Sequence, residues 1–363
     1  MKTLILYILK KALYSVSILW GVMTLIFILF NVIPGDPARM ALGQRSDSAS
    51  LAAVRADLGL DKPVTMQYVK YLNDLSPVSV FNCKDQSSYF FYDTTVYKHS
   101  AKLFNIGESK GLVLKAPYMR RSYQNKRFVS DMISEALVPT FVLAFISIVL
   151  ATIIGIGLGI LSALKKDTWV DKVSIVVSAL GMSLPSYFAA ILFAWLFAYL
   201  LGNVTGLDLT GSLYVIDDMG EGRHLALKNI ILPALTLSIR PLSVFTQLTR
   251  NSMLDTLSQD YIRTARAKGL SQYSVVMHHA LKNALNPVVS SISGWFASMM
   301  AGVIFIEYIF AWKGLGYVMV NALQNFDVPV VMGTVVVISV IFIVVNIFTD
   351  IVYSILDPRI SLK

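Results

Sequence analysis

Apolar residues are grouped along this chain in long runs that short polar stretches separate. A helix needs about 20 consecutive apolar residues to cross a bilayer. Runs of about that length fall in six ranges: 4–33, 137–164, 173–201, 228–248, 288–310 and 328–356. The pattern predicts an all-α integral membrane protein with six transmembrane helices.

Three regions follow from this pattern. Residues 1–34 hold the first span, because the apolar run is longer than a signal peptide's and no small-residue cleavage site follows. Residues 35–133 are expected to form a large extracytoplasmic loop with an insertion near 76–104, where aromatic and charged residues mix without a clear period. The aromatic run at 89–92 favours a packed mini-core over a ligand cage. Residues 134–363 form the core with the other five spans.

The segment 254–287, between the fourth and fifth apolar runs, is charged and amphipathic. Apolar positions recur at helical spacing on both sides of Gly269. Glycine readily adopts the left-handed conformation that ends a helix, Ser271 can cap the next helix, and Pro287 suits a helix's first turn. The sequence therefore predicts a fixed elbow made of two short helices.

Two helices joined at a glycine, with a basic outer face, also occur in DNA-binding proteins. The flanking apolar runs place this elbow at a membrane surface instead, so no nucleic-acid partner is expected. The net charge of +9 is unevenly distributed, since basic residues gather near the N-terminus, around 165–172, in the elbow and at the C-terminus. By the positive-inside rule, both termini and the elbow are predicted to be cytoplasmic.

The stretches 260–270 and 279–287 closely resemble the cytoplasmic coupling segment of ABC transporter permeases, in the first-permease branch of the dipeptide, oligopeptide and nickel importers. Arg263 and Thr264 replace the Glu and first Ala of the broader consensus, and His279 and Lys282 stand at its Ile and Pro positions. The branch shares these departures. The resemblance assigns coupling to an ATP-hydrolysing subunit to Asp260, Tyr261, Arg263, Thr264, Ala265, Arg266, Ala267, Lys268, Gly269 and Leu270.

Further stretches resemble the same family at 31–38, 58–68, 310–316 and 356–359, so the resemblance covers nearly the whole chain except 76–104. It implies a permease subunit of a binding-protein-dependent importer in the bacterial inner membrane. Dipeptides or oligopeptides are the expected substrates, and nickel chelates or another small solute are the alternative. The implied partners are membrane lipid, a second permease subunit in a heterodimer, two ATP-binding subunits that hold ATP and Mg, and an extracytoplasmic substrate-binding protein. No cofactor is expected on this chain.

Some residues in or beside the spans are candidates for the translocation pathway or its gates. A proline removes a backbone hydrogen bond and kinks a helix. A charge at mid-membrane costs about 2.5–3.5 kcal/mol by insertion scales, so Arg240 either lines the pathway or pairs with another group. The resemblance places a glutamate and a glycine-rich turn near the outer mouth, where Trp312 also suits an interfacial belt. The candidates are Pro185, Arg240, Glu307, Gly314, Gly316 and Asp350.

No catalytic residue is assigned. The sequence contains no phosphate-binding loop, HExxH pair or recognisable Ser-His-Asp set. The single cysteine, Cys83, allows neither an intrachain disulfide nor a Cys-based metal cluster. The alternatives are an ion-driven secondary transporter, which needs paired intramembrane charges, a membrane-embedded enzyme, and a structural scaffold that leaves the elbow unexplained.

Overall fold

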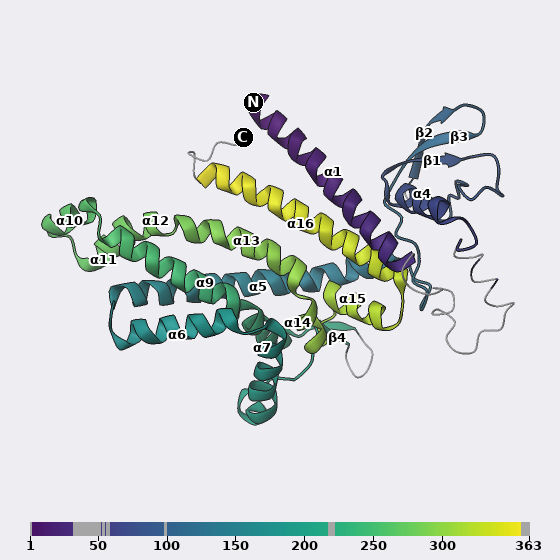
Figure 1. Cartoon of the computed structure of the whole chain (residues 1–363). Coiled ribbons are helices and arrows are strands. Elements are labelled where there is room, and N and C mark those ends of the chain that lie inside the picture. Colours follow the sequence, from purple (N-terminus) through teal and green to yellow (C-terminus); the bar gives the residue numbers. More distant parts are fainter. Residues whose placement is uncertain are drawn as a thin grey trace. The chain divides into compact units, whose positions relative to one another are not determined.

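The computed structural model describes residues 2–31, 52, 55, 59–97, 100–216 and 222–356 (Figure 1). The chain divides into two compact units. We call Met1–Leu13, Glu135–Tyr317 and Ile338–Lys363 the helical unit, and Tyr14–Ser134 with Val318–Val337 the sheet unit. The family-like motifs at 32–38 and 357–359 lie outside the described residues.

Long apolar helices make up most of the helical unit. Its main helices are α6 (Trp169–Ser183), α7 (Ser186–Phe193) with a π-helical continuation (Ala194–Leu200), α9 (Ile231–Leu257), α13 (Asn286–Gly302), α14 (Ile304–Ile309) and most of α5 (Val129–Leu164). Helices α1 (Lys2–Asn31) and α16 (Val328–Leu356) also belong partly to each unit. Short elements between α7 and α9 are α8 (Gly202–Thr205), the antiparallel hairpin β4 (Tyr214–Ile216) and β5 (Arg223–Leu225), and a 3-10 turn (Leu227–Ile230).

The predicted helical membrane fold is confirmed. Among the described residues, four helices are long and apolar enough to cross a membrane, and α6 with α7 and its continuation forms a bent pair that is counted as a fifth. The fifth predicted span corresponds to α13, which has 17 residues, followed by α14. The count of six spans therefore stays a prediction.

Glycines let α5 approach α9 closely. A Cβ on Gly155 would lie 2.9 Å from the carbonyl oxygen of Leu242, and one on Gly159 would lie 2.5 Å from the Cβ of Thr249. Nothing lies within 4 Å of the same position on Gly157. Two of these three glycines therefore face α9 and permit close helix packing.

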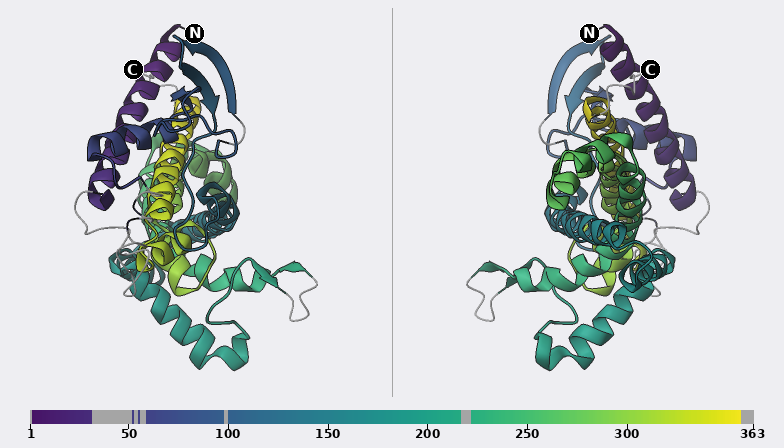
Figure 2. Two further views of the ribbon diagram at one scale, coloured as in Figure 1. Left: turned by 90° about the vertical axis from the view of Figure 1, so that its right-hand side faces the viewer. Right: turned by 90° about the vertical axis from the view of Figure 1, so that its left-hand side faces the viewer.

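The third apolar run, 173–201, contains a sharp bend beside Pro185. Helix α6 ends at Ser183 and α7 begins at Ser186, and the chain bends by 110° between the two helices. Pro185 precedes α7 in extended conformation, which suits its fixed φ and missing backbone donor. Figure 2 shows α7 turning away from the helices that pack beside α6.

The sheet unit contains a small β-sheet that the sequence did not reveal. Its strands are β1 (Val78–Asn82), β2 (Ser100–Ile106) and β3 (Lys110–Lys115), preceded by α4 (Val64–Leu75). The sheet is antiparallel with the order β1-β3-β2. A buried core of Phe81, Tyr97 and Val113 lies on one face, and Tyr92 from the aromatic run packs on Phe81 with ring centroids 5.8 Å apart. The predicted mini-core is present for Tyr92, whereas Tyr89 and Phe91 of the same run line a cavity beside α4.

Candidate functional site

Three local features of the sequence determine the shape of the elbow between α9 and α13. Gly269 follows α10 (Asp260–Ala267) with a φ of +78°, the left-handed conformation predicted for it. The Ser271 hydroxyl accepts a hydrogen bond from the backbone N–H of Ser274 at 3.3 Å, as a helix cap does. Pro287 lies in the first turn of α13. Between them lie α11 (Gln272–Ser274), a π-helical turn (Val275–Ala280) and α12 (Leu281–Ala284).

The inner face of the elbow is packed into the helical unit. Ile262 of α10 and Val276 and Ala280 of the second arm join one buried cluster with Met253 of α9 and Ala163 of α5. Helix α9 runs to Leu257, past the end predicted at 248. The elbow is therefore attached to two long helices through close-packed side chains rather than through its chain ends alone.

The two arms are also joined to each other. The side-chain amide of Asn283 donates a hydrogen bond to the hydroxyl of Tyr261 at 2.9 Å, across 22 positions of sequence. An exposed ion pair, Arg263 to Asp260 at 3.4 Å, lies on α10 itself. With the shared buried face, the Tyr261–Asn283 contact makes the elbow a single body rather than two independent helices.

The outer face of the elbow is both apolar and basic. Tyr273 is 71% exposed and Tyr261 43% exposed, and Leu270 and Met277 are each 40% exposed. These four side chains lie among basic residues that are exposed as well: Arg263, Arg266, Lys268 and Lys282. Exposed apolar side chains gathered on one rigid element are typical of a surface that another protein covers.

A second constellation lies around Glu307 of α14. The Glu307 side chain is fully buried, and its Oε1 accepts a hydrogen bond from the hydroxyl of Thr140 on α5 at 2.6 Å. Its Oε2 accepts from the backbone N–H groups of Gly316 at 2.7 Å and Tyr317 at 3.3 Å. The Thr140 oxygen accepts from the N–H of Leu315 at 2.8 Å. We call Glu307 and Thr140 the outer clamp.

The clamp satisfies the free N–H groups at the start of α15 (Leu315–Gln324). A carboxylate is also favoured there because it faces the positive end of the helix dipole. A Cβ on Gly314 would lie 2.1 Å from Glu307 Oε1, and one on Gly316 would lie 2.4 Å from the Cα of Ile304. Three predicted residues, Glu307, Gly314 and Gly316, are thus brought together.

Trp312 lies inside the protein and not in an interfacial belt. Its side chain is fully buried, and its indole N–H donates to the carbonyl oxygen of Pro139 at 3.0 Å. The sequence could not predict the burial of Trp312, because an aromatic residue beside a glycine-rich turn fits both the protein interior and the membrane interface. The contact adds a second link between α5 and the turn after α14.

The other pathway candidates lie on separate elements. Pro185 is at the bend before α7. Arg240 is exposed on α9, and Asp350 of α16 forms an ion pair with Lys11 of α1. The ion pair gives the Asp350 charge a structural partner. Whether these three residues line a pathway stays a prediction.

Comparison with known proteins identifies the chain. Residues 155–362 match the family described as the binding-protein-dependent transport system inner membrane component. Residues 4–92 match the N-terminal region of such membrane components, which includes part of the predicted insertion. The chain belongs to this family. It is the membrane permease of an ABC importer and lies in the inner membrane, which it crosses several times.

Named relatives of the permease are similar over nearly their full length. A putative peptide permease protein of Brucella suis biovar 1 (strain 1330) is 33% identical, with 98% of each chain covered. The dipeptide transport system permease protein DppB of Alkalihalophilus pseudofirmus is 30% identical, covering 98% of this chain and 99% of its own. The glutathione transport system permease protein GsiC of Pectobacterium atrosepticum is 31% identical, with the same coverage.

An ion pair near the elbow was missed from the sequence. Asp171 of α6 is 2% exposed, and its two carboxylate oxygens accept from Arg250 Nε at 2.6 Å and Nη2 at 2.8 Å. The Ser162 hydroxyl of α5 donates to the same carboxylate. The pair joins three helices of the permease. Its partners are 79 positions apart, and Asp171 stands in a lysine-rich stretch that gives no sign of Arg250.

A charge cluster in the sheet unit was missed as well. Asp74 is 2% exposed; its Oδ1 lies 3.0 Å from Lys70 Nζ, and Lys115 donates to its backbone carbonyl. Burial lowers the pKa of the Lys115 ammonium to about 8, partly opposed by the Asp74 charge. Burial lowers the pKa of Lys70 in the same way. Among the described residues, no group of three or more His, Cys, Asp or Glu side chains could hold a metal ion.

Proposed function

We propose that this permease imports short peptides, and that its elbow docks on an ATP-hydrolysing subunit. The peptide substrate is supported by the names of two relatives. The docking role is supported by the two-sided elbow, whose inner face is packed in the permease and whose outer face exposes Tyr273, Leu270 and Met277. The two-sided elbow is the observation that carries the proposal.

The elbow is built to transmit movement. A close-packed contact passes a displacement on, whereas a loose loop absorbs it. A push on α10 reaches α9 and α5 through Ile262 and Met253, which are both fully buried. Closure of the ATP-hydrolysing partners then favours one of two packings of the spans. The sharp bend at Pro185 and the clamp at Glu307 are proposed as parts of the pathway that this change opens or closes.

The proposed assembly has a second, different permease chain, two ATP-binding subunits that hold ATP and Mg, and an extracytoplasmic substrate-binding protein. Both termini and the elbow are cytoplasmic, and residues 35–133, which include α4 and the β-sheet, are extracytoplasmic. This orientation follows from the distribution of basic residues, since Lys165, Lys166 and Arg263 all belong to the predicted cytoplasmic side.

A mild-detergent pull-down tests the docking surface. The tagged permease should recover a second permease and two ATPases, and Tyr273→Ala should reduce ATPase recovery severalfold because a 71% exposed ring is removed from the outer face. Tyr199→Ala removes a tyrosine that is 72% exposed on the continuation of α7 and serves as the matched control. Equal ATPase recovery by the wild type, Tyr273→Ala and Tyr199→Ala would refute docking through this face.

The substrate is tested by uptake into vesicles that hold the whole complex and its binding protein. Labelled Ala-Phe should enter only with ATP, and unlabelled tripeptides should compete. Glutathione is the second candidate, because one relative is a glutathione permease. Uptake that follows an ion gradient without ATP would contradict an ABC importer, and uptake of glutathione alone would reject the general peptide substrate.

A further inference from the structure

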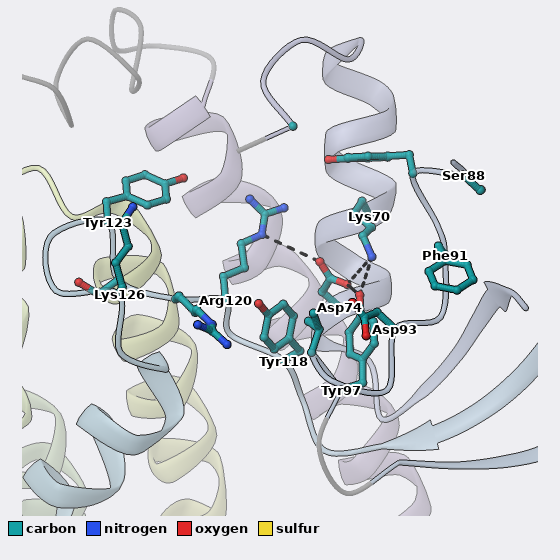
Figure 3. Close-up of a pocket in the computed structure, with 15 residues that line it drawn as sticks. Lys70, Asp74, Ser88, Phe91, Asp93, Tyr97, Tyr118, Arg120, Tyr123 and Lys126 are labelled. Atoms are coloured by element: carbon teal, nitrogen blue, oxygen red, sulfur yellow. Dashed lines mark hydrogen bonds and ion pairs between the residues drawn. The ribbon is translucent and has the colours of Figure 1, made fainter. Parts of the chain in front are cut away.

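The sheet unit contains a cavity that is separate from the elbow and from the outer clamp. It lies beside α4, between residues 88–97 and residues 118–126, and has a volume of about 500 Å³ (Figure 3). Small-molecule sites have volumes of about 300–1,000 Å³. A single side chain of a partner protein would leave most of this cavity empty, so its size favours a separate small ligand.

The Asp74 carboxylate lines the cavity and already has partners within the protein. Asp74 Oδ1 accepts hydrogen bonds from the Tyr97 hydroxyl at 2.8 Å and lies 3.0 Å from Lys70 Nζ. Lys70 also donates to the Tyr97 oxygen at 2.6 Å. These contacts hold Lys70 and Tyr97 in fixed positions on the cavity wall. Asp74 Oδ1 is therefore already paired with Lys70 and Tyr97.

The cavity wall carries more positive than negative charge. Its lining includes four cations, Lys70, Arg120, Arg121 and Lys126, and two carboxylates, Asp74 and Asp93. The Asp93 carboxylate already accepts hydrogen bonds from the backbone and hydroxyl of Thr95, at 2.8 and 2.7 Å. The surplus of two positive charges on a partly enclosed wall attracts an anion.

Arg120 is the cation best placed to bind one. Its Nε lies 4.0 Å from Asp74 Oδ2, while its two terminal nitrogens point away from Asp74 (Figure 3). A guanidinium presents a planar fork that matches a carboxylate in a bidentate pair. The Tyr123 hydroxyl also interacts with Arg120, so a ligand carboxylate would share the guanidinium with Tyr123.

Two of the cationic residues in the cavity wall have a strained backbone conformation. Arg120 has a φ of 66° and Lys126 a φ of 59°, a region that residues with a Cβ rarely adopt. The turn between them is held by a hydrogen bond from the Ser122 N–H to the Arg127 carbonyl at 2.9 Å and by Ser122 donating to Asp327. Strained residues concentrate at binding and switch sites. The observed strain therefore supports a binding role for this turn.

Aromatic rings form much of the remaining wall. Tyr89, Phe91 and Tyr118 line the cavity together with Tyr97 and Tyr123. We propose that the cavity binds a small organic carboxylate with an apolar body, whose carboxylate pairs with Arg120 and whose body lies against these rings. On the proposed import function, the ligand is a short peptide held by its C-terminal carboxylate. The choice of a peptide as the ligand rests on the proposed function. The proposal that Arg120 binds an organic carboxylate does not.

Calorimetric titration of the whole complex in nanodiscs, without its binding protein, tests the site. The probes are Ala-Phe and Ala-Phe amide, which differ only in the terminal carboxylate. Ala-Phe should bind at least about tenfold more tightly than its amide, as expected when a charge-assisted pair is lost. Arg120→Gln should remove that preference, and Arg120→Lys should restore part of it, because an ammonium keeps the charge without the fork.

Two controls keep the result specific to the cavity. Lys110→Gln removes the same charge from exposed Lys110, at the start of β3 and outside the cavity lining, and should leave binding unchanged. Lys126→Gln changes the exposed rim and should weaken Ala-Phe binding less than Arg120→Gln does. Equal binding of acid and amide, or a preference that survives Arg120→Gln, would overturn the proposal. If the same complex still imports Ala-Phe with ATP, only the cavity site fails and the import function stands.

Discussion

The outer clamp predicts different outcomes for two substitutions of Glu307. In Glu307→Gln, the amide oxygen can accept from the N–H groups of Gly316 and Tyr317, and the amide nitrogen can donate to Thr140 Oγ1. The Thr140 hydroxyl can then donate to the Ala136 carbonyl, 3.3 Å away. In Glu307→Ala, no side-chain acceptor remains for either N–H.

The free energies of unfolding should differ accordingly. A hydrogen bond to a charged group contributes about 1.5–3 kcal/mol and a neutral one about 0.5–1.5 kcal/mol. Removing a buried charge offsets part of that loss, so Glu307→Gln should cost about 1 kcal/mol. Glu307→Ala leaves two donors without an acceptor, each costing about 1–3 kcal/mol, and opens a cavity beside Gly314. Its cost should be about 3–5 kcal/mol.

Unfolding of the purified permease by SDS titration measures both costs, and uptake by the reconstituted complex measures function. Glu307→Gln should keep most of the uptake. If Glu307 carried a proton instead, as an ion-driven transporter requires, Glu307→Gln would abolish uptake while leaving stability nearly intact. That result, or a fully stable Glu307→Ala protein, would refute the clamp.

Three further predictions follow. Gly159→Ala should destabilise the permease by about 1–3 kcal/mol because its Cβ overpacks against α9, whereas Gly157→Ala, which meets nothing within 4 Å, should be neutral in the same SDS titration. Asp171→Asn should cost about 3 kcal/mol by weakening a buried pair, and adding Arg250→Gln should recover part of it in a double-mutant cycle. The pKa of Lys115 falls from 10.5 to about 8 on folding, so between these pH values the unfolded chain binds more protons than the folded one. The free energy of unfolding should therefore rise with pH across that window. Lys115→Met should lack this rise, and a Lys115→Met protein with the same pH profile as the wild type would contradict the prediction.

The elbow could be predicted because its signals are local. Gly269, Ser271 and Pro287 each act within a few residues of their position, and the spacing of Ile262 and Ala280 marks the buried face without knowledge of what covers it. Helix α9 continues to Leu257, beyond the apolar run that ends near 248. The residues after 248 are polar enough to end an apolar run but still form a helix.

The rest depends on contacts between distant residues. Glu307 meets Thr140 across 167 positions, and Arg250 meets Asp171 across 79, so neither partner could be chosen from sequence. Strand β2 was missed because nearly all its side chains are exposed, so it lacks the alternation of a half-buried strand. Strands β1 and β3 do alternate in burial, but they bury the polar Ser79 and Lys115 and expose the apolar Val80 and Leu114. The Asp74 cluster was missed because burial of Lys70 and Lys115 arises only from the packing of α4 on the sheet.

The ratio of ATP hydrolysed to peptide imported tests the central claim, that the elbow couples the two. Gly269 has a φ of +78° with nothing within 4 Å of its Cβ position, so Gly269→Val strains the turn without a clash, while Gly269→Asn keeps a residue that tolerates this conformation. In complexes assembled to the same extent, Gly269→Val should hydrolyse ATP with little uptake, and Gly269→Asn should keep the wild-type ratio. An unchanged ratio for Gly269→Val would contradict coupling through the elbow.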